Sequence, residues 1–142
     1  MRRVLFFSLV ATTILAIALG AALTSSEAAQ QGPQFRQVNI RVSCTDGEVD
    51  DVNIQPWTVG ISRGAGQQLR WRLVGNGISS ATVRPKSTSQ WPFDSDPPLT
   101  VEGGAGTDSG PINVGDGTYY YDIIVDCGNG QTVIDPRMDI RP

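Results

Sequence analysis

The sequence predicts an all-β protein, an antiparallel Greek-key β-sandwich or barrel. Three observations lead to this fold class. Apolar and polar residues alternate with a period of two in several segments, glycine-rich turns separate those segments, and beyond residue 28 no stretch of ten or more residues has the 3.6-residue period of a helix. Short, regularly spaced strands of this kind pack as two facing sheets or close into a barrel.

Four segments carry the clearest alternation, and we expect one face of each to lie in the core. These faces consist of Val38, Ile40, Val42 and Cys44; Trp57, Val59 and Ile61; Leu69, Trp71 and Leu73; and Tyr119, Tyr121, Ile123, Val125 and Cys127. Tyr120 and Ile124 lie on the opposite face of the last segment, and the pattern does not decide whether they are exposed.

Weaker strands are expected at 49–54, 80–84, 99–102, 111–114, 131–134 and 137–141. Turn-forming residues at 63–66, 75–77 and 128–130 separate the strands. The glycine-rich segment 103–110 has the composition of a mobile surface loop.

The N-terminal residues 1–28 have the pattern of an export signal. Arg2 and Arg3 precede an apolar run over 4–23, and small residues suitable for cleavage follow. A polar leader over 29–35 and one β-sandwich domain over 36–142 complete the predicted organisation. If the signal is retained, it serves as a membrane anchor. In either case we expect the domain to be extracytoplasmic, either periplasmic or secreted.

Composition excludes several classes of function. Nine basic and thirteen acidic residues follow residue 28, a net charge of −4 that disfavours nucleic acid and anionic membranes as partners. The chain has no histidine, so Ser-His and Cys-His catalysis are excluded. Since no pair of carboxylates stands in an apolar context that would separate their pKa values, we predict that the protein is not an enzyme.

Cys44 and Cys127 each end a strand on its apolar face, and two such cysteines in an exported protein are expected to form a disulfide. The bond would close a loop of about 84 residues and contribute about 4 to 4.5 kcal/mol in the chain-entropy model. The alternative is two buried free thiols. A reactive cysteine is disfavoured because Asp46 and Asp126 are acidic neighbours.

Two segments are candidate binding sites. Trp91 and Phe93, in a polar loop over 86–98, would stack on a sugar ring or contact a partner protein if exposed. Alternatively they fold back and cover one open end of the sandwich. The acidic run 46–51 offers oxygen ligands for calcium but lacks the spacing of a calcium loop, so a solvated hairpin turn is the simpler interpretation.

The segments VGISRG (59–64), QLRWRL (68–73) and VGDGTYYY (114–121) resemble the strands of cupredoxin-like domains. Members of that family bind copper through two histidines, a cysteine and usually a methionine. Cys127 is close to the cysteine position, but Ser79 and Ser80, and the turn 128–130, stand where histidines belong, and Met138 alone does not hold the metal. The resemblance therefore implies a cupredoxin-like fold without a metal or cofactor. An immunoglobulin-like sandwich is the alternative.

These observations predict an exported, non-catalytic β-sandwich module with a binding or structural role at or beyond the cell surface. Its partner would be an unidentified protein or glycan. A carbohydrate-binding or calcium-binding module is the alternative, and a copper or electron-transfer protein is less well supported. The exposure of Trp91 and Phe93 distinguishes a binding loop from a structural one.

Overall fold

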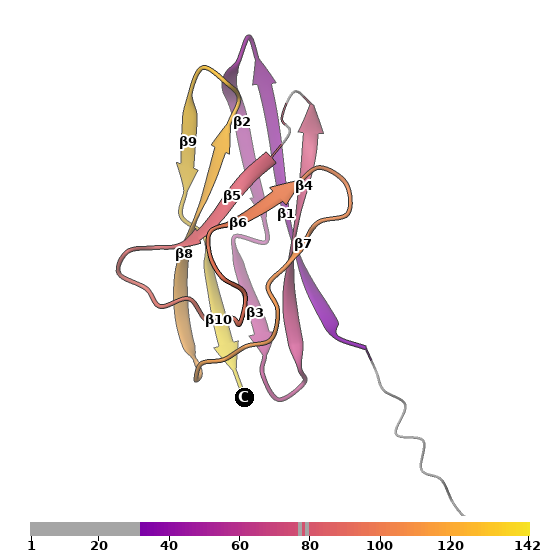
Figure 1. The fold of residues 1–142 in the computed structure, drawn as a ribbon, viewed down its shortest axis with the longest axis vertical. Coiled ribbons are helices and arrows are strands. Elements are labelled where there is room, and N and C mark those ends of the chain that lie inside the picture. Colours follow the sequence, from indigo (N-terminus) through magenta and orange to yellow (C-terminus); the bar gives the residue numbers. More distant parts are fainter. Residues whose placement is uncertain (1–31, 77, 79) are drawn as a thin grey trace, which may run out of the picture. The chain divides into compact units, whose positions relative to one another are not determined.

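The computed structural model describes residues 32–76, 78 and 80–142. The predicted export signal at 1–28 lies outside these residues. Residues Gln31–Pro142 form one compact unit, and its described part consists of strands and connecting loops (Figure 1). No helix in this part of the chain is long and apolar enough to cross a membrane.

Ten strands follow one another in the described residues, which confirms the all-β class. They are β1 (Gln34–Thr45), β2 (Glu48–Gln55), β3 (Thr58–Ser62), β4 (Gln67–Asn76), β5 (Ser80–Pro85), β6 (Leu99–Glu102), β7 (Thr107–Asp108), β8 (Gly117–Asp126), β9 (Gln131–Ile134) and β10 (Arg137–Arg141). The four segments with the clearest alternation became β1, β3, β4 and β8 because each has one buried face.

The strands form two sheets that pack together as a sandwich-like fold. One sheet has the order β2-β1-β4-β7, and the second, strongly curled sheet has the order β3-β10-β8-β5-β6 with β9 also paired to β8 (Figure 1). Both sheets are mixed, since β1 pairs in parallel with β4, and β3 with β10. The prediction of a purely antiparallel arrangement is therefore wrong.

The parallel pairs arise from how the chain changes sheets. β2 runs antiparallel to β1 and then continues through a bend at 56–57 into β3, which belongs to the other sheet. The chain reverses only after β3, so β4 returns beside β1 in the same direction as β1. A period-two pattern identifies each strand but carries no information about this change of sheet.

β8 is the central strand of the second sheet and pairs with β5, β9 and β10. Its first half pairs with β10 and its second half with β9, so these two strands lie one beyond the other along the same edge of β8. β5 pairs with the other edge of β8. The connection between β9 and β10 contains Pro136, whose missing backbone N–H suits a break in the strand.

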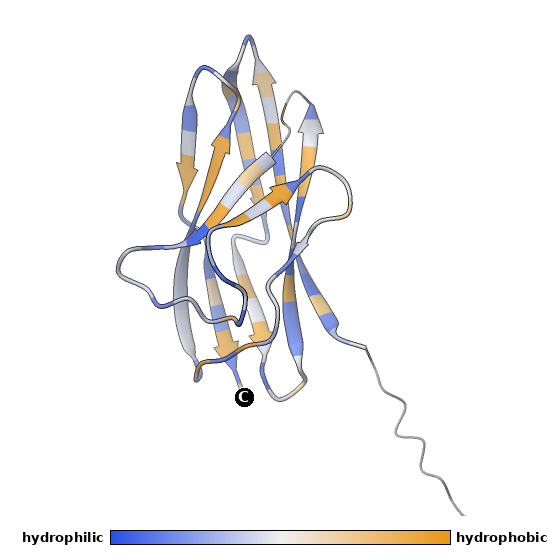
Figure 2. Cartoon of the chain, in the orientation of Figure 1, coloured by the Kyte–Doolittle hydropathy of each residue, from blue (hydrophilic) through white to orange (hydrophobic). Residues whose placement is uncertain are grey.

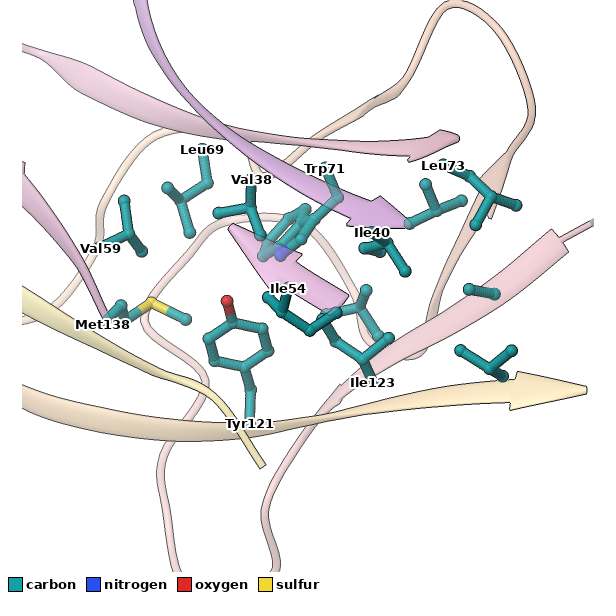
Figure 3. Packing of buried hydrophobic residues seen from close by; sticks show 14 of the residues in the cluster. Val38, Ile40, Ile54, Val59, Leu69, Trp71, Leu73, Tyr121, Ile123 and Met138 are labelled. Carbon is teal, nitrogen blue, oxygen red and sulfur yellow. The ribbon is translucent and has the colours of Figure 1, made fainter. Parts of the chain in front are cut away.

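The core lies between the sheets, and Figure 2 shows the alternating apolar positions that supply it. Trp71 and Tyr121 point toward each other from opposite sheets at its centre (Figure 3). The buried apolar residues are Val38, Ile40, Val42, Ile54, Val59, Ile61, Leu69, Trp71, Leu73, Ala81, Val83, Phe93, Val101, Tyr121, Ile123, Val125, Met138 and Ile140.

Trp57 is the exception to the predicted core, because 52% of its surface is exposed. It shares the sequence parity of Val59 and Ile61, but β3 begins only at Thr58. Trp57 lies in the bend where the chain leaves one sheet for the other. The prediction that it is a core residue is wrong because the alternation of a strand does not extend into this bend.

Two connecting segments also differ from prediction. Residues 111–114 form no strand and contribute only an isolated bridge between Ile112 and Phe93. The glycine-rich segment 103–110 contains β7, which pairs with β4. Within it, Ser109 is buried and its hydroxyl accepts a hydrogen bond from the Leu69 N–H, so this loop is tied to the sheet.

Candidate functional site

Cys44 and Cys127 form the predicted disulfide, with their Cα atoms 5.8 Å apart and 83 positions apart in the sequence. That separation of the Cα atoms is normal for a disulfide. Cys44 is in β1 and Cys127 follows β8, so the bond joins the two sheets near the ends of these strands. The bond also indicates folding in an oxidising, extracytoplasmic compartment.

The acidic run 46–51 begins as a hairpin turn. Asp46 and Gly47 both have positive φ, as a two-residue turn between β1 and β2 requires. The turn rests on the one that follows β8, since the Asn129 side chain donates to the Asp46 carbonyl and the Asn129 N–H donates to that of Gly47, each at 2.7 Å. Within the described residues no three His, Cys, Asp or Glu side chains are grouped as metal ligands would be.

Trp91 and Phe93 belong to a cap over the core. Phe93 is only 2% exposed, and Trp91 is half-buried with its ring stacked on Trp71 at 6.0 Å between centroids. The cap is held by backbone pairing between Phe93 and Ile112 and by a 3.0 Å hydrogen bond from the Asn113 amide to the Phe93 carbonyl. This burial favours the structural interpretation of the loop.

Beneath the cap, the Tyr121 hydroxyl and the Trp71 indole nitrogen are buried in the core. The Tyr121 hydroxyl points toward the indole of Trp71 (Figure 3), and neither the hydroxyl nor the indole nitrogen has a well-formed hydrogen bond among the described residues. Burial raises the pKa of the Tyr121 phenol far above its ordinary value, and interaction with the Trp71 N–H offsets part of that rise. Tyr121 is therefore neutral at any physiological pH.

The structure brings together one pair of carboxylates that the sequence does not reveal. Asp122 on β8 and Asp135 beyond β9 become neighbours because β8 and β9 pair up to Ile123 and Ile134. Arg84 contacts Asp122 at 3.4 Å, and Lys86 contacts Asp135 at 2.8 Å. The hydrogen bond from Lys86 lowers the pKa of Asp135. Each carboxylate has a cation, so the pair is a structural charge cluster.

β3 has an outer edge beside Trp57 that pairs with no other described strand. β3 is the last strand of its sheet and pairs with β10 alone among the described strands. The Arg137 N–H donates to the Trp57 carbonyl at 3.2 Å, and the Arg63 N–H donates to the Arg141 carbonyl at 2.9 Å, so odd-numbered residues face β10. The backbone groups of Thr58 and Gly60 therefore face away from the sheet.

A cavity of about 300 Å³ lies at the end of this edge. Its lining consists of Arg36, Gly60, Ile61, Ser62, Gln67 and Arg141. Two arginines and no aspartate or glutamate are among these residues. In the described residues Arg36 has no ion-pair partner, and Arg141 reaches Asp139 only at 4.0 Å. The cavity is thus rich in hydrogen-bond donors.

We name the outer edge of β3, Trp57 and this cavity together the β3 edge site. None of its members was predicted from the sequence as a binding residue, because the β1 and β3 segments meet only in the folded chain. The exposed backbone of an edge strand also has no sequence signature. No protein-family model matches the chain, and no curated protein matches it either.

Proposed function

We propose that this protein is a non-catalytic, metal-free β-sandwich module of cupredoxin-like type that acts outside the cytoplasm and binds a partner through the β3 edge site. The observation that carries the proposal is Trp57. Trp57 is 52% exposed while its backbone carbonyl accepts a hydrogen bond from the Arg137 N–H, beside a strand edge that no described strand covers. Exposed tryptophans on a fixed backbone are frequent centres of binding energy.

The disulfide supports the metal-free part of the proposal. Cys127 is near the position of the copper-ligating cysteine in cupredoxins, and here its sulfur is bonded to Cys44. A copper thiolate needs a free sulfur, so the disulfide and a blue-copper centre exclude each other at this residue.

The charge cluster supports the non-catalytic part. The one close carboxylate pair found in the described residues, Asp122 and Asp135, is matched by Arg84 and Lys86. General acid-base chemistry needs one carboxyl group kept protonated near neutral pH. Here the hydrogen bond from Lys86 lowers the pKa of Asp135, so Asp135 is ionised near neutral pH and does not act as the general acid.

The test compares Trp57→Ala with Trp91→Ala in the exported protein, with its disulfide intact. We expect Trp57→Ala to abolish co-sedimentation with the envelope fraction of the producing organism and to change the free energy of unfolding by less than about 0.5 kcal/mol, as an exposed side chain should. Trp91→Ala should lower stability and retain co-sedimentation. Undiminished co-sedimentation of Trp57→Ala would contradict the proposed site.

A purely structural role is the second candidate, and the aromatic cap favours it. The sequence suggested a binding role for Trp91 and Phe93 if they were exposed, but both rings pack against Trp71. A structural module predicts that Trp57→Ala leaves every association of the protein unchanged, whereas Phe93→Ala disrupts its fold.

A further inference from the structure

We propose that the partner at the β3 edge site is an extended acidic peptide segment that adds to β3 as a further strand and places a carboxylate in the cavity between Arg36 and Arg141. This inference rests on the proposed function and specifies the chemistry of the partner. It follows from the hydrogen-bonding groups along β3, the charges in the cavity and the lack of protection of this edge.

The backbone of β3 presents the hydrogen-bonding pattern of a missing neighbour. The N–H and C=O groups of Thr58 and Gly60 alternate with those used by β10, and so point outward. At Ser62 the outward N–H already donates to the Gln67 side chain at 3.0 Å, which marks the end of the free edge. An added strand satisfies such groups with its own backbone.

β3 lacks the residues that usually prevent an edge strand from pairing with another chain. Natural edge strands are protected by charges, prolines or bulges, and β2 carries Glu48, Asp50 and Asp51. β3 has the sequence TVGIS, with no charge and no proline. Nothing lies within 4 Å of the position that a Cβ at Gly60 would occupy, so an alanine at this position is tolerated and serves as a control for changes to the backbone.

The cavity selects an anion. Arg36 comes from β1 and Arg141 from β10, and they line one cavity at the far end of β3. Two guanidinium groups at one cavity suit a carboxylate, which accepts hydrogen bonds from both. The chain as a whole is acidic, with a formal net charge of −3, whereas two arginines and no aspartate or glutamate line this cavity.

Trp57 lies at the opposite end of the free edge, immediately before β3. Ser62 comes five positions after Trp57, a span of about 16 to 17 Å along a strand. A peptide of about five or six residues therefore reaches from the indole to the cavity. The partner should combine an apolar side chain near Trp57 with an acidic side chain near Arg36 and Arg141.

The experiment uses two capped peptides on the exported, disulfide-bonded protein. One alternates valine and glutamate over six positions, and the other has glutamine in place of glutamate. We expect the glutamate peptide to bind, with the largest amide chemical-shift changes at Thr58 and Gly60, and the glutamine peptide to bind at least about tenfold more weakly. Equal binding by both peptides, or shift changes that map elsewhere, would overturn the proposal.

Two variants test the two parts of the proposal separately. Gly60→Pro removes one outward N–H without touching the pairing with β10, and should weaken the glutamate peptide at least about tenfold, whereas Gly60→Ala should not. Arg36→Gln with Arg141→Gln should abolish the preference for glutamate over glutamine, whereas the matched pair Arg41→Gln with Arg72→Gln should preserve it, because neither Arg41 nor Arg72 lines this cavity. An unchanged preference in the first pair contradicts the carboxylate site.

The remaining outcomes separate this inference from others. If sodium glutarate alone reproduces all the shift changes, the site takes a small anion and the strand-addition proposal is wrong. If the protein forms a dimer that Gly60→Pro dissociates, the occupant is a second copy of this chain. If Trp57→Ala abolishes envelope binding while both peptides fail to bind, the proposed function stands and the acidic peptide is wrong.

Discussion

At the scale of single residues, the three tryptophans have three environments. Trp71 is fully buried on β4, Trp91 is half-buried in the cap, and Trp57 is 52% exposed in the bend before β3. Only the position of Trp71 follows from strand alternation, because only Trp71 lies within a strand. Phe93 is buried from a loop, by the bridge that holds it against Ile112.

Phe93→Ala should be the most damaging change in the cap. It removes a ring that is 2% exposed and packs edge-on to Trp71, and it should lower the free energy of unfolding by about 3 to 5 kcal/mol. Trp91→Ala should cost less, because part of the Trp91 ring already faces solvent. Urea denaturation measures both, and a larger loss for Trp91→Ala than for Phe93→Ala contradicts this account of the cap.

At the scale of elements, the turns at one end of the two sheets pack against each other. The β1–β2 turn lies against the turn after β8, and a Cβ at Gly47 would lie 2.5 Å from the Asn129 amide nitrogen. Gly47 also has a φ of 83°, in the left-handed region. Glycine is therefore required there both for the turn and for the close approach of the neighbouring turn.

The connection between β9 and β10 should make stability sensitive to acid. The pKa of Asp135 is lowered in the folded state by the hydrogen bond from Lys86, so this interaction stabilises the fold above the unfolded pKa, about 3.9, and is lost as the pH falls through the folded value. Asp126 acts in the same direction, through hydrogen bonds from Gln131 and from the Gly128 N–H. The urea midpoint should therefore decrease below about pH 4.

Asp135→Asn should flatten this acid-side decrease without removing it, because Asp126 remains. The pKa of Lys86 is raised in the folded state, so its contribution to stability is fully present below about pH 10.4 and is lost only at higher pH. Lys86 therefore does not add to the acid-side decrease. Asp94→Asn, an exposed carboxylate away from this ion pair, is the control. An unaltered acid-side slope in Asp135→Asn contradicts the role of the Lys86 ion pair.

At the scale of the whole molecule, the disulfide is the covalent link between the sheets. Cys44→Ala with Cys127→Ala opens a loop spanning 83 positions, and should cost about 4 to 4.5 kcal/mol in the chain-entropy model. Urea denaturation of the double variant measures this loss. A loss below about 1 kcal/mol shows that the turns at Gly47 and Asn129 alone constrain the strand ends.

Much of the fold could be predicted from the sequence because its information is local. Period-two alternation identified β1, β4 and β8 with their buried faces, and the bounds expected for β6, β9 and β10 agree with the structure. Cys44 and Cys127 could be paired because they are the two cysteines of an exported chain. Each of these inferences depends only on neighbouring residues or on composition.

Tertiary structure alone decided how the strands are assembled. The bend at 56–57 moves the chain to the other sheet, which makes both sheets mixed and exposes Trp57. The same change of sheet leaves one edge of β3 without a neighbouring strand among the described residues, and it brings Arg36 of β1 to a cavity shared with Arg141 of β10. These features depend on which distant segments become neighbours, and no alternation within one strand records that choice.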